Sequence, residues 1–361
     1  MKAVVVNAVN AGFDVEEVQI AAPIGGEVLI EVKASGLCHS DLTIATNDLG
    51  FPMPAVFGHE LAGVVTAVGP TVTGITVGDH VVGSLIQSCG KCRRCMAGRS
   101  YNCLHPEATL RTPEQEPRLS RDGQPVAQGF GLAGFAQQAL VHENQLVVLP
   151  KEVPWAQAAL LGCGVVTGAG AVLNTANVQA GDSVVIIGAG GVGLNAVNGA
   201  LVAGASRIVV IDLNDTKLET AKKFGATDVI NSSTTDPVEA VLALTGGADH
   251  VFDFVGFQSV TEQGLKMLGI GGGLYLIGLG KGGTQFTVDS FDALNGQKRV
   301  QGVYMGSSTL QRDIPLYAEL YLQGRFNLDD LVSKEISLDE VNEGYAALKD
   351  PAINRVVITS F

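Results

Sequence analysis

The chain has 361 residues and a formal charge of −13; 46% of its residues are hydrophobic and 46 are glycine. This length suggests two domains, each large enough to bury a core of its own. The negative charge argues against nucleic acid or an anionic membrane as a main partner. The composition favours an α/β enzyme over a helical bundle or a disordered chain.

No segment of the chain is typical of export or membrane insertion. Residues 1–20 lack a basic region, a long apolar core and a cleavage site of small residues. The apolar run 183–211 contains glycines, asparagines and an arginine, and it divides into strand, turn, helix and strand. We therefore expect a cytoplasmic protein without a membrane partner.

The first part of the chain is predicted to be a β-rich lobe, because strand-like runs alternate there with Gly, Pro and Asp. The runs are 2–6, 27–36, 61–69 and 78–83.

Two loops of this lobe carry the sequences GLCHSD and FGHE. Cys38 and His59 are residue types that bind zinc, and Asp41 and Glu60 beside them are acids of the kind that orient zinc ligands. Two ligands do not define a site, so a third must come from elsewhere in the chain.

A cysteine cluster follows in residues 89–103, which contain four of the six cysteines. The spacing is Cys-x2-Cys-x2-Cys-x7-Cys, and the segment has too few large apolar residues to form a core. A tetrahedral zinc ion would supply the missing order, whereas chance clustering of free thiols is the weaker alternative. We assign Cys89, Cys92, Cys95 and Cys103 to this structural zinc. Residues 104–130 are polar and are expected to form a surface loop.

From Pro154 the pattern changes to a helix-like segment and then to alternating strands and helices up to about residue 295. Such alternation predicts a parallel sheet with helices on both faces. We expect the remaining residues, ending in NRVVITSF, to return to the first lobe.

A glycine motif opens the first helix of this alternating region. The residues Gly188, Gly190, Gly191, Val192 and Gly193 follow a β-branched strand, and Asp212 ends the next strand. Glycines allow a pyrophosphate to approach a helix N-terminus, and a carboxylate at this place binds ribose hydroxyls and repels a 2′-phosphate. The sequence therefore predicts NAD rather than NADP.

Cys163, in LLGCGVVTG, supplies the missing ligand. A small buried thiol is by default a core residue, but Cys38 and His59 lack a third partner. A Cys-His-Cys set leaves one zinc position open for water or substrate, as in catalytic sites.

Taken in order, GLCHSD, GHE, CGKCRRC with Cys103, LGCGVVTG and GAGGVG resemble the motifs of the zinc-dependent alcohol dehydrogenases of the medium-chain dehydrogenase/reductase family. The resemblance covers the whole chain. It implies a GroES-like catalytic domain at 1–160 with its zinc lobe at 89–103, a Rossmann NAD-binding domain at 161–297, and a return to the catalytic domain at 298–361. It also implies one catalytic and one structural zinc per chain, and a homodimer or homotetramer.

The resemblance also implies residue roles. Cys38, His59 and Cys163 match the catalytic zinc ligands, Glu60 an exchangeable ligand and Asp41 the partner of the ligating histidine. The expected cofactor contacts are His39, Thr167, Gly188, Gly190, Gly191, Val192, Gly193, Asp212, Lys217 and Arg355. The expected substrate-facing residues are Leu49, Leu85, Leu279 and Met305, an apolar set suited to medium-chain, aromatic or terpenoid alcohols.

The expected reaction is oxidation of such an alcohol to an aldehyde or ketone, and the reverse, through a zinc alkoxide and hydride transfer to nicotinamide. Ser40 is placed to accept the hydroxyl proton. Where many relatives have a histidine that ends the proton relay, this chain has Thr43, which can pass a proton but cannot hold one near neutral pH. Water or another histidine must then finish the relay, with His105 and His142 as weak candidates.

Three alternatives stay open. One is a zinc-containing reductase of an activated C=C or iminium bond, which needs no relay histidine. Another is a thiol-dependent formaldehyde dehydrogenase. A nucleotide-binding protein without turnover ranks last, because no metal ligand is missing.

Overall fold

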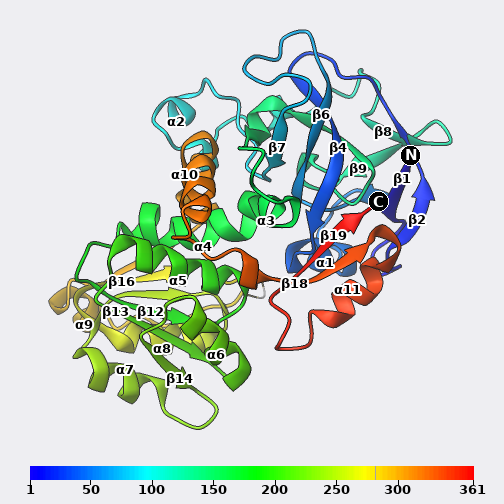
Figure 1. Ribbon diagram of the computed structural model, residues 1–361. Coiled ribbons are helices and arrows are strands. Elements are labelled where there is room, and N and C mark those ends of the chain that lie inside the picture. The colour runs from blue at the N-terminus through cyan, green and yellow to red at the C-terminus, as the bar shows by residue number, and fades with distance from the viewer. Residues whose placement is uncertain (281) are drawn as a thin grey trace. The chain divides into compact units, whose positions relative to one another are not determined.

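The structure is a computed structural model that describes residues 1–280 and 282–361. The chain folds into two compact units. The first unit contains Met1–Cys163, Thr309–Gly324 and Leu328–Phe361, and the second contains Gly164–Ser308 and Arg325–Asn327. Each unit is an independent packing of strands and helices (Figure 1).

The first unit is mainly β-structure. Its strands are β1 (Lys2–Val6), β2 (Asp14–Glu17), β3 (Gln19–Ile20), β4 (Glu27–Gly36), β5 (Ala55–Val56), β6 (Glu60–Val68), β7 (His80–Gly83), β8 (Leu119–Arg121), β9 (Gln124–Gln128), β10 (Gln138–His142), β11 (Leu146–Val148), β18 (Val332–Ser337) and β19 (Arg355–Ser360). Its α-helices are α1 (His39–Thr46), α2 (Arg93–Met96), α3 (Trp155–Leu160), α10 (Leu310–Leu322) and α11 (Val341–Ala347). The expected loop 104–130 contains the hairpin β8–β9, which turns at Asp122 and Gly123, both with positive φ.

Two sheets organise this unit. One has the strand order β11-β7-β6-β4-β19-β18, with β10 also pairing with β4, and the other has the order β2-β1-β5-β9-β8-β3. β19 runs antiparallel to the end of β4, where Val357 pairs with Gly36. The C-terminal strand therefore lies beside the strand that leads into Cys38.

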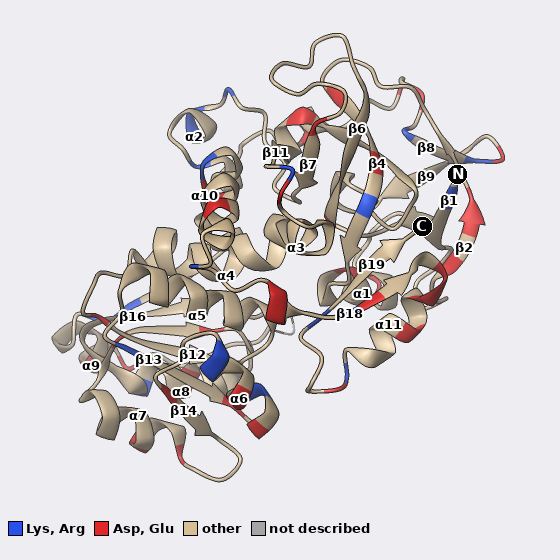
Figure 2. Ribbon diagram, viewed as in Figure 1, with Lys and Arg blue, Asp and Glu red and all other residues tan. Residues whose placement is uncertain are grey.

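The core of the first unit is aromatic and aliphatic. Phe57, Phe135 and Leu37 are fully buried, and Phe13 and Tyr345 pack in the same cluster. Charges lie mainly outside this core, and Figure 2 shows acidic residues along β2 and on α11. Burial of this apolar surface stabilises the unit and fixes the loops that carry the metal-ligand candidates.

The second unit confirms the predicted alternation of strands and helices. Its strands are β12 (Ser183–Ile187), β13 (Arg207–Asp212), β14 (Asp228–Asn231), β15 (Ala248–Asp253), β16 (Leu268–Leu276) and β17 (Arg299–Gly302). Its α-helices are α4 (Val166–Gly170), α5 (Gly191–Ala203), α6 (Asp215–Lys223), α7 (Pro237–Thr245), α8 (Gln258–Met267) and α9 (Ser290–Asn295).

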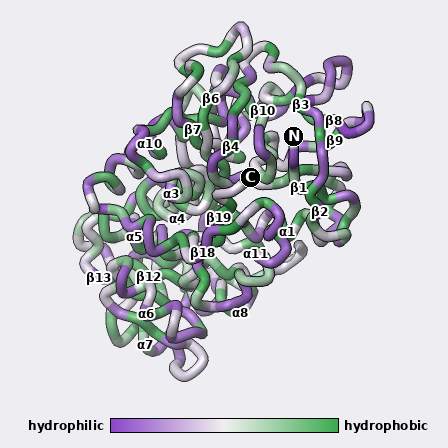
Figure 3. The backbone as a smooth tube through the Cα atoms, turned by 45° about the vertical axis from the view of Figure 1, so that its right-hand side comes forward, coloured by the Kyte–Doolittle hydropathy of each residue, from purple (hydrophilic) through white to green (hydrophobic). Residues whose placement is uncertain are grey.

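The strands of this unit form a parallel sheet in the order β14-β13-β12-β15-β16-β17. Figure 1 shows helices on both faces of the sheet. The central strands are continuous hydrophobic runs, as burial on both faces requires. Figure 3 shows how hydrophobic and hydrophilic segments alternate along the backbone. This is the doubly wound topology of nucleotide-binding domains, in which ligands bind at the carboxyl ends of the strands.

The unit boundaries differ from the expected domain boundaries at two places. Residues 298–308 belong to the second unit, because β17 extends the parallel sheet beside β16. Residues 161–163 belong to the first unit. The return to the first unit therefore begins at Thr309.

One helical stretch, Trp155–Ala176, is long and apolar enough to cross a membrane, but 83% of its most apolar window is buried inside the protein. It is built as a core helix, with π-helical turns at Leu161–Val165 and Ala171–Ala176. Such turns occur frequently at functional sites, and Cys163 lies in the first of them.

Candidate metal centres and nucleotide site

The first unit brings together Cys38, His59, Glu60 and Cys163, whose possible ligand atoms all lie within 4.8 Å of one another and whose side chains are all buried. Cys38 precedes α1, His59 immediately precedes β6, Glu60 is the first residue of β6, and Cys163 lies in a π-helical turn. Two thiols, an imidazole and a carboxylate are a donor set that suits zinc.

Two glycines make this convergence possible. A Cβ on Gly36 would lie 2.3 Å from Glu60 Oε2, and a Cβ on Gly162 would lie 2.0 Å from the Gly83 carbonyl oxygen. Either side chain would push a metal-ligand segment away from its neighbours. Gly162 therefore lets the helix that carries Cys163 approach β7.

The imidazole of His59 is held from both sides. Asp41 Oδ2 lies 2.9 Å from His59 Nδ1, and Cys163 Sγ lies 3.2 Å from His59 Nε2. Burial lowers the pKa of His59, but the charges of Asp41 and Cys38 outweigh it and raise the pKa well above its usual range. A carboxylate on the far nitrogen fixes the tautomer of a metal-binding histidine, and Asp41 occupies that place.

The two buried thiols differ in acidity. The hydrogen bond between them lowers the pKa of Cys38 and raises the pKa of Cys163. His59 and Arg355 add positive charge that also lowers the pKa of Cys38. These surroundings favour the thiolate form of Cys38, which is the form that binds metals.

The carboxylate of Glu60 forms an ion pair with Arg355. Arg355 Nη1 lies 3.3 Å from Glu60 Oε1, and both side chains are buried. Burial raises the pKa of Glu60 to about 7. Within the described part of the chain, neither Glu60 oxygen accepts a hydrogen bond. Buried acceptors of this kind normally have a partner, so these oxygens fit a role as occasional metal ligands.

The residues expected to move protons lie on α1. Ser40 is half-buried, whereas His39 and Thr43 are exposed. His105 pairs with Glu107, and His142 accepts a hydrogen bond from the Asn144 amide, so each has a local partner outside α1. Nothing in these contacts makes either histidine the end of a relay from Ser40.

The four cysteines of the 89–103 lobe also converge, again within 4.8 Å. The sulfur of Cys92 lies 3.5 Å from that of Cys95 and 4.0 Å from that of Cys103. Four thiolates around a tetrahedral zinc ion have their sulfurs about 3.8 Å apart, which is close to both distances. Backbone amides donate to the sulfurs of Cys89 and Cys103. Hydrogen bonds from the backbone of Leu104 and then of Cys95 lower the pKa of Cys92 to about 6. The cluster fits a structural zinc site.

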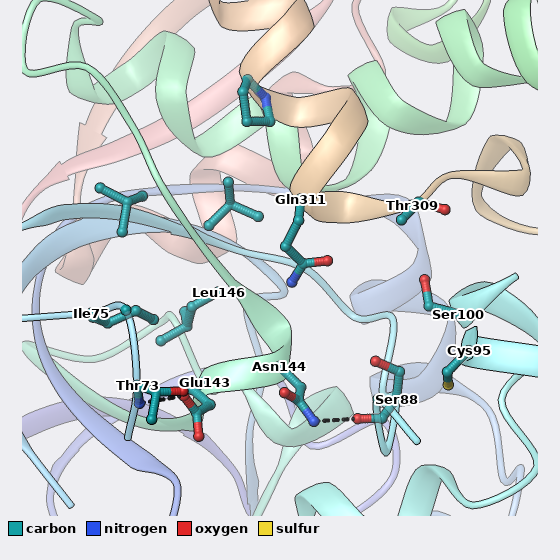
Figure 4. A pocket seen from close by; sticks show the side chains of 15 residues that line it. Thr73, Ile75, Ser88, Cys95, Ser100, Glu143, Asn144, Leu146, Thr309 and Gln311 are labelled. Atoms are coloured by element: carbon teal, nitrogen blue, oxygen red, sulfur yellow. Dashed lines mark hydrogen bonds between the residues drawn. The ribbon is translucent and has the colours of Figure 1, made fainter. Parts of the chain in front are cut away.

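A pocket of about 570 Å³ lies beside this lobe (Figure 4). Cys95 and Ser100 of the lobe, Asn144, and Thr309 and Gln311 of the α10 region line it. Thr309 Oγ1 donates to the Gly98 carbonyl at 2.8 Å, which links the start of α10 to the lobe. The expected substrate-facing residues do not line this pocket.

The glycine motif of the second unit has the form that a dinucleotide needs. Gly188 has φ +101°, and a Cβ on Gly193 would lie 2.0 Å from the Gly188 carbonyl oxygen, so both positions require glycine. A Cβ on Gly190 would meet nothing within 4 Å, which leaves open space at the N-terminus of α5. A pyrophosphate can approach the backbone there.

Asp212 is fixed at the end of β13. Its carboxylate accepts hydrogen bonds from the backbone amides of Ala189 at 2.9 Å and Asn214 at 3.1 Å. The acid is therefore tied to the glycine motif. Lys217, on α6, is half-buried.

The residues expected to contact nicotinamide and substrate differ in their burial. Thr167 donates its hydroxyl to the Met305 sulfur at 3.5 Å, and Val192 is half-buried at the start of α5. Leu85 and Met305 are buried, while Leu49 and Leu279 are 63% and 80% exposed. The pocket role of these four side chains remains a prediction.

Two contacts around the Cys38, His59, Glu60 and Cys163 cluster could not be predicted from the sequence. The pairing of Arg355 with Glu60 joins residues from opposite ends of the chain, and so does a hydrogen bond from Tyr345 to the Cys38 carbonyl. No local motif signals either contact.

The fold and the two clusters define an oxidoreductase class that combines bound metal with a nucleotide cofactor. Residues 25–151 match the alcohol dehydrogenase GroES-like domain, and residues 191–322 match the zinc-binding dehydrogenase domain. The chain belongs to the zinc-dependent alcohol dehydrogenases of the medium-chain dehydrogenase/reductase family.

Several relatives cover nearly the whole chain. The NDMA-dependent alcohol dehydrogenase of Amycolatopsis methanolica is 38% identical over 99% of this chain and 98% of its own. The S-(hydroxymethyl)glutathione dehydrogenase of Paracoccus denitrificans is 34% identical over 94% of each. The benzyl alcohol dehydrogenase structure from Acinetobacter calcoaceticus matches with a TM-score of 0.94 and 37% identity, covering 100% of this chain and 99% of that one.

Proposed function

We propose that the protein catalyses the reversible, NAD-linked oxidation of a hydrophobic alcohol to its aldehyde or ketone. The observation that carries this proposal is the buried set Cys38, His59, Glu60 and Cys163, with ligand atoms within 4.8 Å of one another. Family membership supports both the metal and the nucleotide cofactor.

In this proposal Cys38, His59 and Cys163 hold the catalytic zinc, and Glu60 is an alternative ligand. Zinc held there supplies Lewis acidity, which lowers the pKa of an alcohol hydroxyl, and NAD supplies a hydride acceptor. Asp41 keeps His59 in the tautomer that presents Nε2 to the metal. Ser40, two residues after Cys38 on α1, accepts the hydroxyl proton and passes it on through Thr43 or water.

Asp212 supports NAD as the cofactor. Its carboxylate is held by two backbone amides, so it cannot easily turn away from a 2′-phosphate. In the proposed binding mode, Gly190 and the N-terminus of α5 hold the pyrophosphate, and Lys217 on α6 is a further cofactor contact. Because one relative is named NDMA-dependent, NDMA belongs among the acceptors tested.

A benzylic alcohol is the first substrate candidate. The match to a benzyl alcohol dehydrogenase structure supports this choice, as does the apolar character of the expected substrate-facing residues.

The second candidate is a thiol-dependent formaldehyde dehydrogenase, favoured by relatives named S-(hydroxymethyl)glutathione dehydrogenase. Oxidation of formaldehyde only in the presence of glutathione would identify this activity. Equal rates with and without glutathione would exclude it.

We also infer a cytoplasmic homodimer or homotetramer. All the cysteines are free, as expected in a reducing compartment. β17 is the last strand of its sheet and is exposed along its length, which leaves an edge that a second copy could extend. Light scattering of the purified protein tests the assembly.

The decisive experiment measures NAD reduction by the zinc-loaded protein with benzyl alcohol, hexanol, a secondary alcohol and a polyol. We expect two zinc ions per chain and the highest kcat/KM with benzyl alcohol or hexanol. Polyol preference would overturn the substrate class, and zinc confined to the 89–103 lobe would overturn the mechanism.

A further inference from the structure

The backbone of Cys38 is held by a side chain from the far end of the sequence. The Tyr345 hydroxyl donates to the Cys38 carbonyl oxygen at 3.3 Å, across a separation of 307 residues. The same carbonyl accepts the first helical hydrogen bond of α1, from the Leu42 amide, at 3.5 Å. That helical bond is long. Tyr345 therefore adds a second hydrogen bond to the carbonyl at which α1 begins.

The direction of the Tyr345 hydroxyl is fixed by packing. Its ring stacks on Phe13 with centroids 4.9 Å apart and meets Phe135 edge-on at 6.4 Å. Asn342, one turn earlier on α11, accepts from the Phe13 amide at 3.3 Å and donates to the Phe13 carbonyl at 2.8 Å. The ring cannot turn without disturbing this buried cluster.

α11 approaches the residue before Cys38 unusually closely. A Cβ on Gly344 would lie 2.7 Å from both Leu37 Cδ2 and Ile336 Cδ1. Glycine inside a helix costs about 1 kcal/mol relative to alanine, so its place here reflects the close approach. On its backbone side, Leu37 donates its amide to the Val356 carbonyl at 2.9 Å. The C-terminal segment thus holds residues 37 and 38 through both α11 and β19.

The first turn of α1 carries two groups of the metal site. Cys38 precedes the helix, and Asp41 follows within one turn. Asp41 Oδ1 accepts from the Gly58 amide at 3.3 Å, and Oδ2 lies 2.9 Å from His59. A shift of this turn would therefore move a ligand and the group that orients another ligand at the same time.

We propose that Tyr345 is a positioning residue for the catalytic metal: its hydroxyl fixes the first turn of α1 and so sets the directions of the Cys38 thiolate and the Asp41 carboxylate. This inference rests on the proposed catalytic metal site. Tyr345 acts through Cys38 and Asp41 and touches neither substrate nor cofactor in this role.

The test is Tyr345→Phe, which removes the hydroxyl and keeps the ring. The catalytic site of the full-length protein is loaded with Co²⁺, whose thiolate charge-transfer and d–d bands report ligand geometry. We expect shifted bands and a loss of catalytic-site metal affinity of about 10–100-fold in chelator competition, with zinc in the 89–103 lobe retained. Tyr321→Phe is the control. The hydroxyl of Tyr321, on α10, donates to Asp329 at 2.8 Å, and we expect removal of this hydroxyl to leave the cobalt spectrum and the metal affinity unchanged.

Gly344→Ala provides a second test with the hydroxyl intact. The new methyl group presses on Leu37, so we expect band shifts and weaker metal binding here too. A lower melting temperature in Tyr345→Phe with the wild-type cobalt spectrum and affinity would overturn the inference, because it would show an ordinary structural role. Wild-type protein that binds no metal outside the lobe would overturn the proposed function and this inference together, and that result appears before any variant is compared.

Discussion

The Asp41 carboxylate lies 2.9 Å from His59 Nδ1, while the opposite ring nitrogen of His59 lies 3.2 Å from the Cys163 sulfur. Asp41, on α1, thus determines which ring nitrogen of His59, the residue before β6, faces Cys163. Both side chains of the Asp41–His59 pair are fully buried, so water cannot replace either partner.

Asp41→Asn is therefore expected to weaken catalytic zinc binding and to lower kcat by about 10–100-fold, the usual effect of losing a partner of a metal-binding histidine. The amide keeps the size of the side chain but can present its NH₂ to His59, which favours the wrong tautomer. Zinc affinity by chelator competition and kcat with benzyl alcohol measure the effect. Asp48→Asn, on an exposed turn after α1, should change neither quantity, and an unchanged Asp41→Asn enzyme would contradict the assigned role.

The two proposed metal sites should separate in a pair of cysteine variants. Cys38→Ser removes a ligand in a packed core, so we expect loss of activity and of one zinc with the fold kept. Cys95→Ser removes a ligand from a lobe without its own core, and metal binding there contributes folding free energy. We expect Cys95→Ser to lose the other zinc and to melt at a clearly lower temperature. Zinc analysis and calorimetry on both variants check this, and equal melting temperatures would contradict the structural assignment.

Features that depend on residues close together in the sequence, such as single strands and the glycine turn, could be predicted. The run 27–36 coincides with β4, and the glycine motif follows β12 and opens α5 as expected. Cys163 was found only by elimination, because its own surroundings are those of a core thiol.

The contacts that could not be predicted are long-range in sequence. β19 pairs with β4 and β18, and β17 joins the second unit instead of the first. Arg355 pairs with Glu60, a contact that no local pattern indicates, while its expected contact with the cofactor stays a prediction. Such pairings depend on which strand edges and cavities remain free once the fold is formed, and a single sequence does not show this.

Two glycines of the nucleotide motif should respond differently to alanine. At Gly193 a Cβ would lie 2.0 Å from the Gly188 carbonyl oxygen, so Gly193→Ala forces α5 away from its strand. We expect a loss of about 1–3 kcal/mol in stability, as for other overpacked sites. At Gly190 the space is open and φ is −79°. Gly190→Ala should keep wild-type stability and weaken NADH binding, because the methyl group occupies the space where the pyrophosphate approaches.

Denaturant unfolding and NADH fluorescence titration distinguish the two variants. Unchanged NADH affinity in Gly190→Ala would contradict the placement of the cofactor on this turn.

Cofactor choice should depend on Asp212. Asp212→Asn removes the charge that repels a 2′-phosphate and keeps an oxygen that can accept from the Ala189 amide. A unit-charge repulsion near 4 Å is worth between about 1 and 4 kcal/mol. We therefore expect the ratio of kcat/KM for NADP to that for NAD to rise by at least about fivefold. Glu219→Gln, an exposed charge on α6, is the control, and an unchanged ratio in Asp212→Asn would contradict the proposed ribose contact.

Acid stability should depend on Glu27, which joins the 104–118 segment to β4. Glu27 is 3% exposed; its Oε1 accepts from Arg118 Nε at 2.7 Å, and its Oε2 accepts from Arg111 Nη2 at 2.6 Å. Burial raises the pKa of Glu27, but the hydrogen bonds from Arg111, Ile24 and Arg118 outweigh it and leave the pKa below its usual value. A lowered folded-state pKa means that the carboxylate stabilises the protein above about pH 4.3, its unfolded value, and that this stability disappears as the pH falls through the lower folded value.

Glu27→Gln should therefore destabilise the protein by about 3–5 kcal/mol at pH 7, because two buried guanidinium groups lose their counter-ion. Its unfolding free energy should also fall less steeply than that of the wild type below about pH 4.3. Glu31→Gln on the same strand removes half of an exposed pair with Lys33, and exposed pairs contribute at most about 1 kcal/mol. Urea unfolding of the three proteins between about pH 3 and 7 measures both effects. If Glu27→Gln and the wild type lost stability in parallel as the pH fell, another carboxylate would control acid unfolding.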